Sequence, residues 1–197
     1  EERGLFLQAF VNKPPRGSIS SEVHFTPTCL ARALVQQAIQ ALPNDIRSVP
    51  ALDVLDPACG SGIFLQEAAR ELRSMGFSGK LSLRGFDISA ESCAMARFAL
   101  ERVCSEARQA KIRADFNIER KDALLLDWGK PDLVLMNPPF KSYQNMTQEE
   151  RDQVKQVLGK AAAGRFDKSM AFILKGVEAM GPRSALASIL PAILFEV

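Results

Sequence analysis

The sequence predicts an α/β protein with a doubly wound, mainly parallel sheet, and three observations support this prediction. Short apolar runs of strand length alternate along the chain with longer segments of helical periodicity, which is the pattern of successive β-α units. Two of these runs end in a polar residue followed by a glycine or proline turn, as expected where parallel strands reach a ligand-binding edge. With 197 residues, 47% of them hydrophobic, the chain can bury one sizeable core, so we expect a single domain.

The N-terminal part of the chain carries little periodicity. Residues 1–22 are interrupted by glycine, proline and serine, so we expect a loosely ordered segment before a folded core at 23–197. Thr26 and Pro27 favour a helix start, because a threonine hydroxyl can cap the first turn and a proline is tolerated in it. This helix should end at Pro43 and bury one stripe of apolar side chains, namely Leu30, Leu34, Ile39 and Leu42.

The remaining elements alternate as the fold class requires. Strands are expected at 52–56, 80–86, 116–120, 132–136 and 184–190. Helices are expected at 63–72, 90–107, 147–158 and 169–180. The third of these helices has the clearest start, because Thr147 and Glu150 match the capping-box pattern.

A glycine turn follows the first expected strand. The strand ends at Asp56, and the turn contains Gly60 and Gly62, which can adopt backbone conformations that other residues resist. The pattern is neither the glycine-rich dinucleotide fingerprint nor a phosphate-binding loop, since no Lys-Ser/Thr pair follows the glycines. The turn therefore indicates a ligand that lies close to the backbone, but not necessarily a pyrophosphate.

A rigid turn follows the fourth expected strand. Asn137 precedes Pro138 and Pro139, which fix their φ angles and have no N–H, and Phe140 adds an aromatic face. An amide oxygen, a carbonyl and an aromatic ring in one turn suit a flat ring that carries an amino group. Taken alone, the same residues are equally well explained as a proline-rich loop after a strand.

The two motifs together resemble those of S-adenosylmethionine-dependent adenine-N6 DNA methyltransferases, in the group whose cofactor motifs precede the catalytic one. Further matches reach from about Val23 to Phe195, at His24–Pro27, Gly85–Ile88, Lys121–Ala123, Asp167–Phe172 and Ile189–Pro191. The resemblance implies a Rossmann-like methyltransferase fold with strand order 3-2-1-4-5. It also implies S-adenosyl-L-methionine as the cofactor.

The resemblance assigns residues to each part of this cofactor. The methionine and sulfonium end would meet Thr26, which can also cap its helix, and the turn residues Asp56, Ala58, Cys59, Gly60 and Gly62. Asp87, with Ile88 beside it, would bind the ribose hydroxyls, although Asp87 could instead cap the following helix.

The adenine of the cofactor would meet residues that follow the third and fourth strands. The resemblance assigns its amino group to Asp122 and its ring to the backbone N–H of Ala123. Phe172 would offer the ring an apolar face, and core packing explains this residue equally well.

The catalytic residues implied by the resemblance are Asn137, Pro138, Pro139 and Phe140. The Asn137 side-chain oxygen and the Pro138 carbonyl would accept the two N–H groups of the target adenine, whose amine is otherwise a poor nucleophile. Acceptors fixed in advance stabilise the charge that develops on this nitrogen. The target base must leave the duplex to be reached, and Phe140 would stack on it.

Composition excludes some classes and leaves others open. The formal charge of +2 does not by itself indicate nucleic-acid binding, so DNA as partner depends on the resemblance. The four cysteines form no C-x-x-C pair and the sequence has one histidine, so we expect no metal site and reduced thiols in the cytoplasm. No stretch has the length of apolar residues that a membrane span needs.

Related methyltransferases continue beyond the fifth strand, whereas this chain ends six residues after Pro191. We therefore expect a core without the C-terminal strands and without a target-recognition region, which a separate specificity subunit could supply. The leading hypothesis is an adenine-N6 DNA methyltransferase of a restriction-modification or related defence system. Two alternatives stay open: a methyltransferase of RNA or of a protein glutamine, and a non-catalytic binding or scaffold subunit.

Overall fold

The computed structural model describes residues 5–9, 26–162 and 166–190, and in these ranges six parallel strands form one sheet. The strands are β1 (Leu5–Ala9), β2 (Ala51–Asp56), β3 (Lys80–Asp87), β4 (Arg113–Arg120), β5 (Leu133–Met136) and β6 (Ala185–Leu190). Their order across the sheet is β1-β6-β5-β2-β3-β4. The five strands expected from the sequence therefore lie in the order 3-2-1-4-5, as the resemblance implied, and the doubly wound α/β class is confirmed.

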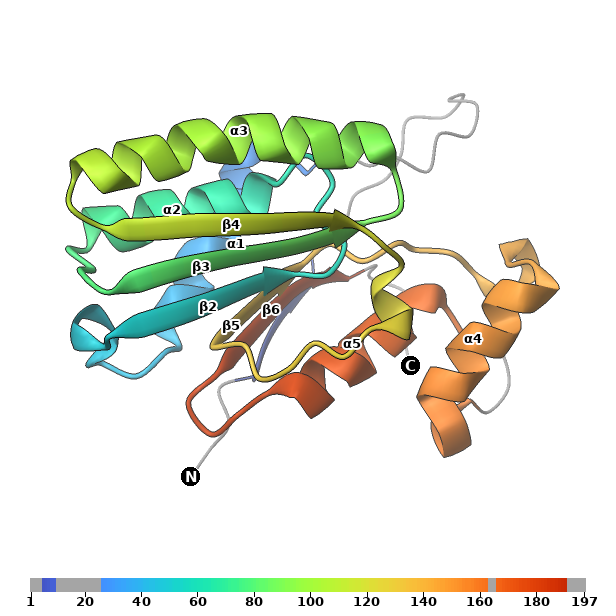
Figure 1. The fold of residues 1–197 in the computed structure, drawn as a ribbon. Coiled ribbons are helices and arrows are strands. Elements are labelled where there is room, and N and C mark those ends of the chain that lie inside the picture. The colour runs from blue at the N-terminus through green and yellow to red at the C-terminus, as the bar shows by residue number, and fades with distance from the viewer. Residues whose placement is uncertain (1–4, 10–25, 163–165, 191–197) are drawn as a thin grey trace.

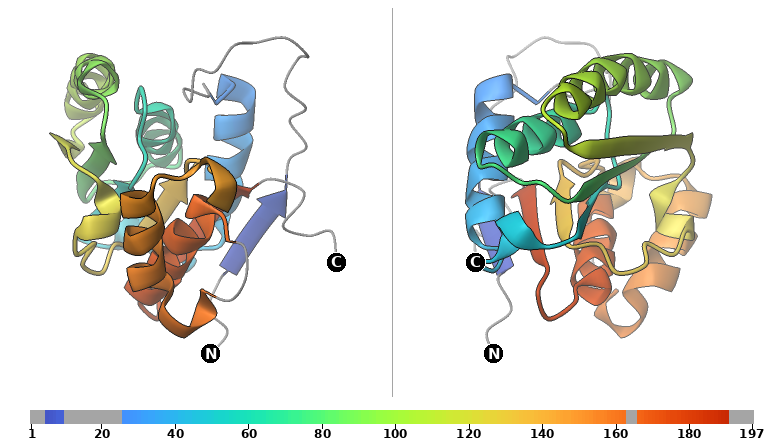
Figure 2. Two further views of the ribbon diagram at one scale, coloured as in Figure 1. Left: turned by 90° about the vertical axis from the view of Figure 1, so that its right-hand side faces the viewer. Right: turned by 60° about the vertical axis from the view of Figure 1, so that its left-hand side comes forward.

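Helices cover both faces of the sheet, as Figure 1 and Figure 2 show. One face carries α1 (Thr28–Gln40), α2 (Ile63–Ser74) and α3 (Ala90–Gln109), and the other carries α4 (Gln148–Leu158) and α5 (Lys168–Ala179). Each face has its own apolar core. The larger core joins α1, α2 and α3 to the sheet, and the smaller one gathers around Trp128 and Phe172.

The expected boundaries agree with the structure to within a few residues. Ser89 caps α3 by accepting a hydrogen bond from the N–H of Ser92, and Thr147 and Glu150 form the predicted capping box of α4. Strand β4 begins at Arg113, three residues before the predicted start. The prediction began too late because polar side chains of this edge strand alternate towards solvent and weaken the apolar signal. Short 3-10 turns occupy Ile46–Ser48, Ala123–Leu125, Tyr143–Asn145 and Gly159–Ala161.

The prediction of a loosely ordered N-terminal segment is wrong for Leu5–Ala9. This run forms β1 and pairs in parallel with β6, from Leu5 opposite Leu186 to Ala9 opposite Leu190. Without β1, the outer edge of β6 would present unpaired backbone N–H and C=O groups, and pairing satisfies them. The rest of that segment, residues 1–4 and 10–22, lies outside the described residues, as do His24, Phe25 and Pro191.

Candidate active site

Parallel strands bring the predicted site residues to one edge of the sheet. Strands β2 and β3 end at Asp56 and Asp87, and Asn137 follows the last residue of β5. Asp122 lies just past the end of β4. Because all these strands point the same way, their carboxyl ends lie along the edge at which open α/β sheets bind ligands (Figure 1).

The glycine turn is tied to the end of β3 by backbone hydrogen bonds. The N–H of Cys59 donates to the carbonyl of Phe86 at 2.8 Å, and the N–H of Gly60 donates to Asp87 Oδ2 at 2.9 Å. Gly60 has a φ of +51°, and a Cβ atom at this position would meet nothing within 4 Å. Gly62 has a φ of +78°, and its Cβ would come within 3.2 Å of Ala96. The turn thus needs glycine for its conformation, and at Gly60 it leaves open space for a ligand.

Asp56 has a buried carboxyl group with an unused oxygen. Its side chain is fully buried, Oδ1 accepts a hydrogen bond from the N–H of Ala58 at 3.1 Å, and Oδ2 has no partner among the described residues. Burial raises the pKa of Asp56 to about 8; the Ala58 bond opposes this rise, and the nearby charge of Asp87 adds to it. A cationic ligand group would satisfy both the empty acceptor and the unfavourable burial of the negative charge.

Asp87 does not cap the following helix, so that alternative is wrong. Ser89 is the capping residue, and the N–H of Ser89 donates to Asp87 Oδ1 at 2.8 Å. The carboxylate therefore bridges the glycine turn and the start of α3, and it remains partly exposed. Beside it, the Ile88 side chain is 65% exposed.

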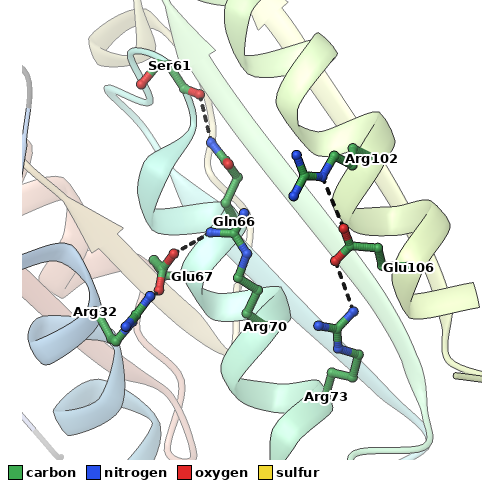
Figure 3. Close-up of polar contacts among 8 residues, drawn as sticks. All are labelled: Arg32, Ser61, Gln66, Glu67, Arg70, Arg73, Arg102 and Glu106. Carbon is green, nitrogen blue, oxygen red and sulfur yellow. Dashed lines mark hydrogen bonds and ion pairs between the residues drawn. The ribbon is translucent and has the colours of Figure 1, made fainter. Parts of the chain in front are cut away.

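Polar contacts on the outer face fix the helix that begins at the glycine turn, as Figure 3 shows. Gln66 Nε2 donates to the carbonyl of Ser61 at 3.2 Å, inside the turn itself. The buried Glu67 of α2 accepts from Arg32 of α1 at 2.9 Å and also pairs with Arg70. Arg73 of α2 contacts Glu106 of α3 at 3.1 Å, and Arg102, also on α3, holds the same carboxylate at 3.1 Å. Helix α2, which begins at the turn, is therefore held by both neighbouring helices.

The turn after β4 is supported by two aromatic side chains. Asp122 Oδ1 accepts from the N–H of Leu124 at 3.0 Å, and Trp128 Nε1 donates to the carbonyl of Ala123 at 2.9 Å. Phe172 is 3% exposed, and its ring lies 6.2 Å from that of Trp128, centroid to centroid. Of the two roles expected for Phe172, the structure shows core packing, and contact with a cofactor ring stays a prediction.

Asn137 presents a buried and unused acceptor. Its Nδ2 donates to Thr26 Oγ1 at 3.1 Å, and its Oδ1 has no hydrogen-bond partner in the ranges that the structure describes. Pro138 is buried behind it, whereas Pro139 is exposed and the Phe140 side chain is 37% exposed. A fixed amide oxygen and an accessible aromatic ring therefore follow β5 directly.

The prediction that Thr26 caps the first helix is wrong. Helix α1 begins at Thr28, Pro27 occupies the capping position, and no side chain caps its first turn. The Thr26 hydroxyl instead accepts the hydrogen bond from Asn137, which is 111 residues away in sequence. No local pattern could indicate this contact, because it depends on α1 beginning beside the end of β5.

The loop after Phe140 is fastened to the start of α5. The N–H of Lys168 donates to the carbonyl of Lys141 at 2.9 Å, and Ser142 forms an antiparallel bridge with Asp167. Asp167 also caps α5 by accepting from the N–H of Ser169 at 2.8 Å. Sequence reasoning matched the 167–172 segment to a helix start but did not predict its contact with the loop after Phe140.

This fold, with acidic residues and a glycine turn at the carboxyl ends of its central strands, is the Rossmann-like fold of S-adenosylmethionine-dependent methyltransferases. A Listeria monocytogenes protein assigned to class I of these enzymes shares it with a TM-score of 0.65 and 19% identity, over 91% of this chain and 50% of that one. The chain belongs to the N-6 DNA Methylase family, whose sequence model matches residues 6–196.

Two further relatives are methyltransferases, and the second belongs to a restriction-modification system. The type II methyltransferase M.VspI of Vibrio sp. (strain 343) is 25% identical over 178 residues, which are 89% of this chain and 38% of that protein. The methyltransferase subunit of a type I system from Streptococcus thermophilus has a TM-score of 0.59 and 21% identity, over 86% of this chain and 34% of that one. The chain thus spans half or less of the length of these relatives.

Two features of the chain as a whole complete the description. In the described ranges, no helix combines the length and apolar character that crossing a bilayer requires. Cys29, Cys59, Cys93 and Cys104 are all free thiols, and burial raises the pKa of Cys59 well above its ordinary value. A thiol with a raised pKa is a poor nucleophile, and Cys59 is buried in the larger apolar core.

Proposed function

We propose that this chain carries the cofactor site and the target-amine site of an enzyme that transfers a methyl group from S-adenosyl-L-methionine to N6 of adenine in DNA. The observation that supports this most strongly is the buried Oδ1 of Asn137, which lacks a partner among the described residues. An amino group is the natural donor for such an acceptor, and leaving it unpaired costs about 1–3 kcal/mol. Membership of the N-6 DNA Methylase family supports methyl transfer to DNA.

The residues at the sheet edge fit the parts of this cofactor, which supplies a methyl group on a cationic sulfonium. The second oxygen of Asp56 fits the cationic methionine end, and the open space at Gly60 allows a ligand to approach the backbone. Asp87 would accept hydrogen bonds from the ribose hydroxyls, and Asp122 from the adenine amino group. Each of these carboxylates is already oriented by a backbone N–H, so little order is lost when a ligand binds.

Asn137 would act on the target amine by fixing its geometry. Its Oδ1 accepts one N–H and the Pro138 carbonyl accepts the other, which favours a more tetrahedral nitrogen whose lone pair is less delocalised into the ring. The same two acceptors stabilise the positive charge that develops on the nitrogen, and the methylated nitrogen then loses a proton to water. Thr26 holds the Asn137 amide in the required orientation through the 3.1 Å hydrogen bond.

Phe140 would receive the flipped base. Its ring is 37% exposed, next to Asn137, and an aromatic face contributes about 1–3 kcal/mol to the stacking of a base. The restriction-modification relative from Streptococcus thermophilus favours an enzyme that works in such a system, in the cytoplasm and with target recognition supplied by a further domain or subunit.

The test is to incubate the intact protein with DNA and S-adenosylmethionine bearing a labelled methyl group, and then to analyse the nucleosides by mass spectrometry. Labelled N6-methyladenine is the expected product. Asn137→Ala should abolish it while cofactor affinity stays near that of the wild type. The matched control is Asn117→Ala, since Asn117 is exposed on β4 and contacts Glu119. A methyl group on cytosine, on RNA or on a protein glutamine, or an active Asn137→Ala variant, would overturn the proposal.

A further inference from the structure

Lys168 is a buried lysine at the start of α5. Its side chain is 9% exposed, and its Nζ lies 3.9 Å from Asp122 Oδ2 and 3.6 Å from Glu150 Oε1. Lysine is almost never buried to this degree without a charged partner, because its ammonium group loses hydration. The position of Lys168 therefore depends on these two carboxylates.

The two carboxylates belong to different parts of the candidate site. Asp122 follows β4 at the turn assigned to the cofactor adenine. Glu150 lies on α4, where its Oε2 accepts from the N–H of Thr147 at 2.8 Å and its Oε1 accepts from Lys141 Nζ at 3.1 Å. Lys141 directly follows Phe140. The charges of Asp122, Lys168, Glu150 and Lys141 thus form a continuous series. It connects the turn assigned to the cofactor adenine to the loop that follows Phe140.

The charges of this series are held in place. Burial alone would raise the pKa of Glu150, but the Thr147 hydrogen bond and the charges of Lys141 and Lys168 outweigh it, so the pKa lies below its ordinary value. Glu150 is therefore a carboxylate at neutral pH. The backbone reinforces the link, since the N–H of Lys168 donates to the carbonyl of Lys141.

We propose that Lys168 is a positioning residue that couples the binding of a ligand beside Asp122 to the order of the loop from Asn137 to Glu150. A ligand placed over Asp122 excludes water from the neighbouring ion pairs. Coulomb attraction grows as the local dielectric falls, so the Lys168 pairs strengthen and hold Glu150, and through it Lys141, more firmly. The inference rests on the proposed function, because it takes the Asp122 side as the cofactor site.

The test is hydrogen-deuterium exchange of the intact protein with and without S-adenosylmethionine, compared between wild type and variants. In the wild type, the cofactor should slow exchange in the turn at 59–62, and it should slow exchange in the loop at 141–150 by about fivefold or more, the lower range of typical coupling between sites. Lys168→Met keeps the length of the side chain and removes its charge, and it should lose the loop response only. Lys168→Arg should restore part of that response.

Two further variants separate coupling from loss of charge or of folding. Lys155→Met removes a lysine that is exposed on α4, and it should behave as the wild type does. Glu150→Gln keeps an acceptor for the Thr147 N–H and removes the charge, so it should lose the loop response with cofactor affinity changed by less than about twofold. This variant carries the test if Lys168→Met fails to fold.

The outcomes distinguish this inference from the function on which it rests. A loop response that persists in Lys168→Met or Glu150→Gln, or that is absent in the wild type while the turn responds, overturns the coupling and leaves the cofactor site intact. A wild-type protein in which S-adenosylmethionine slows exchange in neither segment overturns the proposed cofactor site, and the coupling with it.

Discussion

Replacement of Asp56 by asparagine should stabilise the protein and weaken its cofactor site at the same time. The buried carboxyl has a pKa of about 8, far above its ordinary value of 3.8, so it binds a proton in the folded state over a pH range in which the unfolded chain has lost it. Asparagine resembles the protonated form in size and keeps an oxygen for the N–H of Ala58. It cannot supply the negative charge that a cationic ligand group needs.

The size of this stabilisation follows from the pKa values of Asp56 in the folded protein and in the unfolded chain. A raised pKa in the folded state contributes stability that is fully present below pH 3.8 and is lost as the pH rises through about 8. Between about pH 5.5 and pH 8, this loss amounts to about 3 kcal/mol, at 1.36 kcal/mol for each pH unit. Asp56→Asn removes that dependence, so its stability should exceed that of the wild type more at high pH than at low pH.

The assay is urea denaturation of both proteins at about pH 5.5 and about pH 8.5, with the double difference in unfolding free energy as the measured quantity. The pH dependence of groups that do not interact with Asp56 cancels in this difference, and about 3 kcal/mol should remain. Calorimetry should show that the variant binds S-adenosylmethionine at least tenfold more weakly, since a charge-assisted contact contributes about 1.5–3 kcal/mol. A double difference near zero would refute the buried-acid reasoning, and unchanged affinity would refute the cofactor role of Asp56.

Three further substitutions test the other parts of the site. Asp87→Ala should weaken S-adenosylmethionine binding by about 1.5–3 kcal/mol in calorimetry, through lost hydrogen bonds to the ribose, and unchanged affinity would contradict the assignment. Thr26→Val should slow methyl transfer by about threefold to tenfold because the Asn137 amide loses its anchor, whereas Thr26→Ser should restore the rate; equal rates in all three proteins would show that the anchor is unimportant. Phe140→Ala should weaken capture of a flipped base by about 1–3 kcal/mol, measured with DNA that carries a fluorescent adenine analogue, and Phe140→Tyr should retain capture.

The fold could be predicted largely from local patterns. Apolar runs that end at Asp56, Asp87 and Asn137 have the length of buried strands, and the turns after them limit the backbone strongly. Strand β1 could not be predicted in the same way. Although Gly4 precedes its short apolar run, the pairing of this run with β6 joins segments that lie at opposite ends of the sequence, which no local pattern indicates.

The candidate site divides in a similar way. The residues of the glycine turn and of the Asn137 turn could be named from the sequence because the backbone itself restricts their chemistry. The bond from Asn137 to Thr26 and the ion pairs of Lys168 could not, because each depends on which helix packs beside which strand end. A lysine after an aspartate at a helix start is ordinarily exposed, so nothing local indicated that Lys168 is buried.

Trp128, which donates a hydrogen bond to the carbonyl of Ala123, is an intrinsic fluorescent probe. Trp128 is the one tryptophan in the sequence, it is 2% exposed, and it supports the turn assigned to the cofactor adenine. Its ultraviolet emission therefore comes from a single known place, with no label attached and no background from a second indole. A ligand that enters beside Asp122 should change that emission, whereas one that binds on the far face of α3 should leave it unaltered.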